Sequence, residues 1–245
     1  MTWKATRALV TGGTRGIGEQ LVRELVQRCL RVTATGTSEA SVREASARLP
    51  QVHWEVLDQG DADSRAAFAG RVARADFDLV IHNAGIQQLR DWTAPDAAVD
   101  FDTEREMQIN FVGPVELTRL LLPQLARQKQ AAIVFVTSGL ALAPKKSSPV
   151  YCASKAALRS FAKSLRAQLQ NEGLPVRVIE ALPPIVDTDM TRGRGRGKIS
   201  AQAAARQILA GIDAGRQEID VGATRLLRLI QRISPALAGR IMIKR

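Results

Sequence analysis

Short apolar runs alternate with longer amphipathic stretches along most of the chain. The apolar runs, each about as long as a strand, fall at residues 7–10, 32–35, 52–56, 79–81, 133–136, 176–179 and 219–221. Patterns of helical period follow most of them, at residues 17–28, 41–49, 64–73, 103–125 and 150–169. Strands that alternate with helices predict βαβ units joined by right-handed crossovers. We therefore predict an α/β fold with a doubly wound, mostly parallel, seven-stranded sheet and helices on both faces.

Length and composition fit one domain. The chain has 245 residues, 45% of them hydrophobic, and we expect a single domain over residues 1–245. No apolar run is long enough for a membrane-spanning helix, and the first six residues show no signal-peptide pattern. The two cysteines, Cys29 and Cys152, and the two histidines, His53 and His82, are widely spaced. We expect reduced thiols, no metal site and a cytoplasmic location.

A glycine-rich segment joins the first strand to the first helix. Residues 11–18 read Thr-Gly-Gly-Thr-Arg-Gly-Ile-Gly. Glycines allow a tight turn there and let the N–H groups at the start of the helix approach a pyrophosphate. Gly12, Gly16 and Gly18 therefore indicate a dinucleotide site in a Rossmann-like fold; the alternative is an ordinary glycine-rich turn.

A tyrosine and a lysine lie four residues apart in a predicted helix. Tyr151, the only tyrosine of the chain, and Lys155 therefore share one helix face. An ammonium nearby favours the phenolate, so we expect Lys155 to lower the pKa of Tyr151. Such a pair suits acid–base chemistry on a carbonyl or alcohol oxygen, whereas taken alone it also fits a solvated helix surface.

Three polar positions fall near strand ends or inside a helix. Ser138 follows the apolar run 133–136, and Asn83-Ala84-Gly85 follows the run 79–81, where open α/β sheets place their ligands. Asn110 lies in a helical stretch that asparagine mildly disfavours. Structural roles, as a turn residue or as a polar group on a helix face, are the alternatives for Ser138 and Asn110.

Taken together, these motifs resemble the short-chain dehydrogenase/reductase family over essentially the whole chain. The resemblance implies that Tyr151 is the catalytic acid and base and that Ser138 holds the substrate oxygen. Lys155 would bind the nicotinamide ribose, and Asn110 would support a water that links Lys155 to solvent. Within the family, the C-terminal region resembles the oxidoreductases named after the D-alanylation operon.

The same resemblance supplies a set of candidate cofactor-binding residues. It places Asn83 and Gly85 near the adenosine ribose and Asp58 at the adenine. Pro184 stands where the family usually has glycine, which fixes φ and removes an N–H near the nicotinamide. The full candidate set is Gly12, Thr14, Arg15, Gly16, Ile17, Gly18, Thr37, Ser38, Asp58, Asn83, Ala84, Gly85, Tyr151, Lys155, Pro183, Ile185, Val186 and Thr188.

The residues after the second strand bear on cofactor choice. NAD enzymes commonly place an acid there for the ribose 2′-hydroxyl. Here Thr37 and Ser38 come first, and Arg15 adds a cation in the glycine loop. We therefore expect NADP(H) rather than NAD(H), with helix capping as the alternative role of Thr37 and Ser38.

The C-terminal quarter is strongly basic. Residues 191–245 contain 12 Lys and Arg against 3 Asp and Glu, which gives +9 of the net +11. We expect a substrate lid over residues 189–217 and a basic amphipathic tail over residues 223–245. An arginine–glycine tract for nucleic acid is disfavoured because residues 192–198 form only one short run.

The apolar side of the tail needs a partner surface. It carries Leu226, Ile230, Ile233, Leu237 and Ile241, and we expect it to pack within the folded protein. An anionic membrane or a partner subunit are the alternatives. From the resemblance, residues 103–125 and 150–169 would pair across a two-fold axis in a homodimer or homotetramer.

The predicted activity is NADPH-dependent reduction of a small-molecule carbonyl, or the reverse oxidation of an alcohol. The alternatives are a cofactor-binding scaffold without turnover and a protein that binds membrane or nucleic acid through its basic tail.

Overall fold

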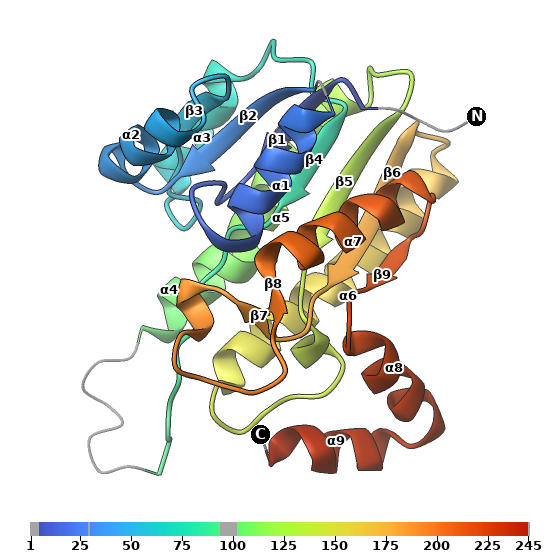
Figure 1. The fold of residues 1–245 in the computed structure, drawn as a ribbon. Coiled ribbons are helices and arrows are strands. Elements are labelled where there is room, and N and C mark those ends of the chain that lie inside the picture. The colour runs from blue at the N-terminus through green and yellow to red at the C-terminus, as the bar shows by residue number, and fades with distance from the viewer. Residues whose placement is uncertain (1–4, 29, 94–101, 245) are drawn as a thin grey trace.

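A computed structural model describes residues 5–28, 30–93 and 102–244. Seven strands form one sheet in the order β3-β2-β1-β4-β5-β6-β9, and every neighbouring pair is parallel (Figure 1). The strands are β1 (Arg7–Val10), β2 (Arg31–Gly36), β3 (His53–Val56), β4 (Leu79–His82), β5 (Ala131–Val136), β6 (Val176–Leu182) and β9 (Glu218–Asp220). The predicted doubly wound, seven-stranded fold is confirmed.

Helices cover both faces of the sheet (Figure 1). On one face lie α1 (Gly16–Gln27), α2 (Glu39–Arg48) and α7 (Ala201–Asp213), and on the other lie α3 (Ala62–Arg71), α5 (Gly113–Leu125) and α6 (Pro149–Asn171). Each set buries an apolar cluster against the sheet, with Leu21, Leu25 and Ile208 on the first face and Leu117 and Leu158 on the second. The crossover helices thereby exclude water from both sides of the strands.

One predicted helix, residues 103–125, contains a change of helical type. It begins as α4 (Thr103–Met107), passes through a π-helical segment at Gln108–Val112 and continues as α5. A π turn holds one more residue than an α turn, so it alters which side chains face the sheet. The segment carries Asn110, which is buried beside the cleft described below.

Short elements follow β6. Strands β7 (Val186–Asp187) and β8 (Ile199–Ser200) pair in a second small sheet, which the sequence did not reveal because two residues carry no periodicity. Short 3₁₀ turns occur at Gly139–Ala141 and Asp189–Thr191. Beyond them α7 packs its buried side chains into the core, so any mobile cover would have to precede α7.

The chain ends in a helical arm, α8 (Thr224–Ile233) and α9 (Pro235–Ile243), which projects from the body (Figure 1). The expectation that its apolar side packs within the fold is largely wrong. Leu226, Ile233 and Leu237 are exposed, while Ile230 and Ile241 are half-buried. The physical reason is that α8 follows the last strand of the sheet and has no strand layer left to cover.

The cysteines and the lengths of the helices bear on two further expectations from the sequence. Cys152 is a buried free thiol, whereas Cys29 lies outside the described residues. Among the helices of the described ranges, none is long and apolar enough to cross a bilayer.

Candidate active site

A cleft of about 620 Å³ opens outside the carboxyl ends of β1, β2, β4 and β5. Its position matches the crevice where the strand order reverses between β1 and β4, at which open α/β sheets bind ligands. Predicted residues line most of it, namely Gly12, Thr14, Arg15, Gly16, Ile17, Thr37, Asp58, Asn83, Ala84, Gly85, Tyr151, Lys155, Pro183 and Thr188. Six others lie outside the lining: Gly18, Ser38, Asn110, Ser138, Ile185 and Val186.

The glycine loop has the close approaches that its sequence implied. Gly12 and Gly16 have φ of 64° and 59°, a region that favours glycine. A Cβ on Gly12 would lie 2.8 Å from the Cα of Ala84, and one on Gly18 would lie 2.0 Å from the carbonyl oxygen of Gly12. Within the described chain no side chain caps α1 at Arg15, so the N–H groups of its first turn face the cleft uncapped. These features fit a pyrophosphate.

Asn83 locks the end of strand β4 to this loop. Its side-chain amide donates to the carbonyls of Thr11 and Gly12, at 3.0 and 3.1 Å. The hydroxyl of Thr11 in turn accepts from the backbone N–H groups of Asn83 and Ala84, both at 3.1 Å. The Asn83 side chain therefore holds the loop in shape, a role that Thr11 shares and that was predicted for neither residue.

Asn110 is buried beside the cleft, and both its amide oxygen and its amide nitrogen are hydrogen-bonded. Its Oδ1 accepts from the N–H of Ile86 at 2.9 Å, and its Nδ2 donates to the Ile86 carbonyl at 2.9 Å and to Ser154 Oγ at 3.1 Å. A Cβ on Gly85 would lie 3.0 Å from Asn110 Oδ1 and 3.3 Å from Lys155 Nζ. The missing side chain of Gly85 thus leaves space that Asn110 and Lys155 both border.

The ammonium of Lys155 lies in the floor of the cleft. It donates to the carbonyl of Val136 at 3.0 Å, and burial lowers the pKa of Lys155 to about 8 while Glu106 opposes that change. Glu106 is fully buried, accepts from the N–H of Gln88 at 3.2 Å, and has a raised pKa because of that burial. Glu106 was not predicted, because a glutamate in an amphipathic helix normally faces water.

Tyr151 lies one helical turn before Lys155 on α6. The Lys155 ammonium is 5.8 Å from the centre of the Tyr151 ring. Burial raises the pKa of Tyr151 to about 12, although a hydrogen bond with Ser138 acts to lower it. The expected lowering by Lys155 is therefore not found in this arrangement, where desolvation of the phenolate is the larger effect.

Ser138 sits at the carboxyl end of β5. It is buried, and its Oγ accepts from the N–H of Leu140 at 3.1 Å, while its polar contact with the phenol acts to lower the pKa of Tyr151. The carbonyl of Pro183 accepts from the N–H of Gly139 at 2.9 Å, which ties the end of β6 to the same turn. Ser138 and Tyr151, 13 positions apart in sequence, are thus brought together as predicted.

The end of the cleft at β2 contains two guanidinium groups. Arg15 belongs to the loop, and Arg48 on α2 donates to the carbonyl of Thr14 at 2.8 Å. Arg48 was not predicted, because nothing in the sequence places α2 against the glycine loop. Thr37 lines the cleft, whereas the Ser38 hydroxyl accepts from the Ser41 N–H and caps α2.

Asp58 and Gln59 shape the wall between β3 and the π-helical segment. Asp58 Oδ2 pairs with Arg105 at 2.5 Å, and its Oδ1 accepts from the N–H of Gly60 at 3.0 Å. Gln59, which was not predicted, is buried and donates to the carbonyl of Ile109 at 2.6 Å. A π turn frees main-chain carbonyls, and Gln59 satisfies one of them.

The segment after β6 closes the cleft on the opposite side. A Cβ on Gly16 would lie 3.2 Å from Thr188 Cγ2, so Thr188 reaches across to the glycine loop. Val186 is buried in β7, and Ile185 lies under Gly195, whose Cβ would be 2.2 Å from Ile185 Cδ1. Pro184 lies next to Gly222, on which a Cβ would be 3.4 Å from the proline Cγ.

Comparison with known proteins identifies the family to which this fold and this cleft belong. The family described as short chain dehydrogenase matches residues 6–198. The chain belongs to the short-chain dehydrogenase family. An oxidoreductase of Bacillus subtilis (strain 168), "Uncharacterized oxidoreductase DltE", is 39% identical over 220 residues, 86% of each chain. A serine 3-dehydrogenase of Agrobacterium fabrum is 31% identical over 209 residues, 84% of this chain and 80% of that one.

Solved structures of other short-chain dehydrogenases share the fold. One from Burkholderia cenocepacia J2315, in complex with NADP, superposes with a TM-score of 0.85 at 29% identity and covers 99% of both chains. One from Burkholderia phymatum, in complex with NAD, has a TM-score of 0.81 at 19% identity over 95% and 96% of the two chains. These two neighbours thus hold different nicotinamide cofactors, NADP in one and NAD in the other.

Proposed function

We propose that this short-chain dehydrogenase reduces a small-molecule carbonyl with NADPH, or oxidises the corresponding alcohol, with Tyr151 as acid and base. The observation that carries this proposal is the grouping of Tyr151 and Lys155 in the lining of the cleft, with the buried Ser138 next to Tyr151. The glycine loop and the uncapped start of α1 lie along the same cleft, which gives room for a dinucleotide.

The residues of the cleft divide into those that hold the cofactor and those that handle the proton. The glycine loop would bind the pyrophosphate. Asp58 and the wall beside it would contact the adenine, and Thr188 would contact the nicotinamide end. When bound, NADPH supplies a hydride to the carbonyl carbon. The Lys155 ammonium would hydrogen-bond the nicotinamide ribose, and Asn110 would keep the wall beside it in place.

Tyr151 supplies the proton in the reductive direction. With a pKa of about 12 the phenol is protonated at neutral pH, so it is ready to donate. Ser138 holds the substrate oxygen within hydrogen-bond reach and stabilises its growing negative charge. A substrate alkoxide is a stronger base than a phenolate, so proton transfer from Tyr151 is downhill once hydride has moved.

The test of this mechanism removes one hydroxyl. Tyr151→Phe keeps the ring, and we expect it to retain NADPH affinity but lose turnover by at least about 100-fold. A carbonyl panel with NADPH oxidation as readout supplies the substrate for this assay. Near-normal turnover by Tyr151→Phe would show that another group donates the proton.

The cofactor preference rests on the cationic end of the cleft. Arg15 and Arg48 lie where a 2′-phosphate would be received, and Thr37 adds a hydroxyl. Glu44, four residues before Arg48 on α2, lines the same end and works against a phosphate. We propose that the two guanidinium groups outweigh it, so the dissociation constant should be lower for NADPH than for NADH.

Arg15→Ala and Arg48→Ala test this preference separately. Each should weaken NADPH binding by about 10-fold and leave NADH binding nearly unchanged, since only NADPH carries the extra phosphate. Equal binding of the two cofactors by the unaltered protein would reject the preference while leaving the Tyr151 mechanism untouched.

Three further expectations remain part of the proposal. The enzyme works in the cytoplasm. Residues 103–125 and 150–169 pair across a two-fold axis in a homodimer or homotetramer, and light scattering would measure the molar mass of that assembly. The part of the predicted lid before α7, residues 189–200, covers the substrate.

A further inference from the structure

The arm α8–α9 presents a strip of large apolar side chains to solvent. Leu226, Leu229 and Ile233 are spaced by three and four residues, so they lie on one side of α8. Ile233 is 78% exposed, Leu226 61% and Leu229 54%. Leu237 and Ile243 are exposed on α9. Large apolar side chains gathered in this way mark an interaction surface.

Another side of α8 contacts the body of the protein. Thr224 is buried, and a Cβ on Gly139 would lie 3.0 Å from its Oγ1 and 3.6 Å from Leu227 Cδ2. Gln231 donates to the carbonyl of Leu142 at 2.9 Å. The arm therefore packs on the turn that follows Ser138, at the catalytic end of the cleft.

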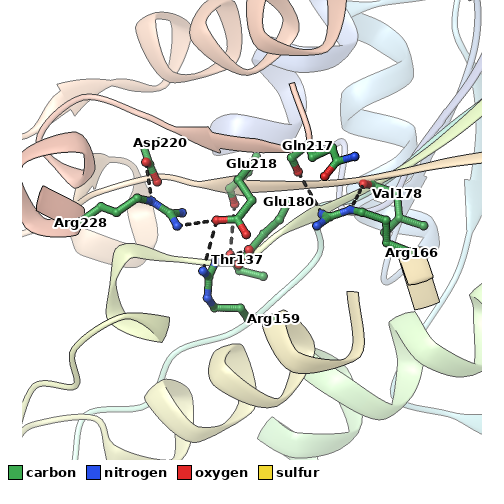
Figure 2. Close-up of polar contacts among 10 residues, drawn as sticks. Thr137, Arg159, Arg166, Val178, Glu180, Gln217, Glu218, Asp220 and Arg228 are labelled. Atoms are coloured by element: carbon green, nitrogen blue, oxygen red, sulfur yellow. Dashed lines mark hydrogen bonds and ion pairs between the residues drawn. The ribbon is translucent and has the colours of Figure 1, made fainter. Parts of the chain in front are cut away.

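A chain of ion pairs fixes the arm in this orientation (Figure 2). Arg228 on α8 pairs with Glu218 and, at 2.5 Å, with Asp220, both on the edge strand β9. Glu218 also pairs at 3.2 Å with Arg159 of α6, which in turn pairs with the buried Glu180. Because Arg228 is held on this side, α8 cannot roll its apolar strip onto the core.

The charges around the strip identify its partner. After Asp220 the chain contains no acidic residue, and Arg225, Arg232, Arg240 and Lys244 are exposed. A second copy seated on the same strip would bring these like charges together, which opposes association. An anionic surface would neutralise them, and cations beside an apolar strip are the composition of helices that lie in a membrane interface.

We propose that the α8–α9 strip docks on an anionic phospholipid bilayer. The apolar side chains would enter the boundary between headgroups and acyl chains, and the four cations would contact lipid phosphates. The protein then lies on the membrane without crossing it. Because the arm packs beside Ser138, docking brings the catalytic end of the cleft close to the lipid surface.

The experiment is co-sedimentation of the full chain with vesicles of equal parts phosphatidylglycerol and phosphatidylcholine. We expect binding that weakens as salt is raised and that is lost on vesicles of phosphatidylcholine alone. Leu229→Ser/Ile233→Ser should lower the partition coefficient at least about 10-fold. Leu174→Ser, an exposed leucine at the opposite end of the sheet, is the matched control and should bind like the unaltered protein.

The charge contribution has its own variant. Arg232→Gln/Arg240→Gln should reduce binding about 10-fold or more, since each cation near an anionic surface contributes separately. Arg43→Gln/Arg74→Gln removes two exposed cations from other parts of the molecule and should have little effect. Thermal unfolding of every variant verifies that the fold is kept.

Two outcomes would overturn the proposal. The first is no binding by the unaltered protein, or binding that these arm variants leave unchanged. The second is a molar mass by light scattering that falls by half or more in Leu229→Ser/Ile233→Ser while no variant binds vesicles. In that case the strip is an interface between copies of this chain.

Discussion

Helix α1 and helix α8 both carry an apolar side and a charged side, but only α1 buries its apolar side. In α1, Leu21 and Leu25 are buried in the core that α1 and α7 cover together. In α8, Leu226 and Ile233 face solvent. The difference lies in connectivity: α1 joins β1 to β2, which are neighbours in the sheet, whereas α8 follows β9 at the sheet edge. Periodicity predicts which residues share a face, and topology decides what that face meets.

The largest expected difference between the two helices comes from shortening one leucine in each of them. Leu25→Ala should lower the free energy of unfolding by about 3 kcal/mol, because it leaves a cavity under α1. Leu229→Ala removes the same atoms from an exposed site and should change it by no more than about 0.5 kcal/mol. Chemical denaturation measures both. Comparable losses would mean that α8 is covered in solution by a second copy or by its own body.

A second test uses pH, which acts on the core and not on the arm. His82 is buried at the end of β4, and burial lowers its pKa from 6.5 to about 3. The folded protein favours neutral His82, so this stabilisation is complete above pH 6.5 and is lost as the pH falls from 6.5 toward 3.

The free energy of unfolding should therefore fall by about 2 kcal/mol between pH 7 and pH 5 from this group alone. His82→Gln should flatten that part of the profile, and the exposed His53→Gln should not. The arm has no histidine and no carboxyl side chain after Asp220, so Leu229→Ser should keep the slope of the unaltered protein. A profile that His82→Gln leaves unchanged would refute this account.

The smallest expected effect is the difference in stability between losing the ion pairs of α8 and losing an ion pair of α1. Arg228→Met removes the pairs that anchor α8 to Glu218 and Asp220, and we expect a loss of about 1–2 kcal/mol because Arg228 is largely buried. Arg206→Met removes an exposed arginine that pairs with Glu24 of α1, and we expect less than about 1 kcal/mol. Differential scanning calorimetry measures both, and the reverse ranking would contradict the assigned roles.

Much of the architecture could be predicted from the chain alone. All seven main strands lie where apolar runs indicated, because buried parallel strands need such runs. β6 extends to Leu182, three residues past the predicted end, since its last residues are also buried. The outward strip of Leu226 and Ile233 could not be foreseen, because it depends on where the sheet ends relative to α8.

The candidate site was predictable where chemistry follows from residue type and spacing. The loop at Gly12 and the turn from Tyr151 to Lys155 are of this kind. The assigned roles of these residues stay predictions. The roles of Glu106 and Gln59 could not be predicted, because the burial of these side chains depends on partners distant in sequence. The pKa of Tyr151 moved opposite to expectation because spacing reveals a neighbouring charge but not the loss of water.

The π-helical segment at Gln108–Val112 has a consequence for how this chain tolerates change in length. One extra residue is held in that turn, so deleting any single residue of it would restore an uninterrupted α-helix. Everything on the α4 side would then turn by about 100° relative to α5. Substitutions here alter one side chain, but a one-residue deletion would swing buried Glu106 out of the site and disconnect Asn110 from Ile86. The number of residues in this segment therefore matters as well as their identity, because it sets the rotation of α4 relative to α5.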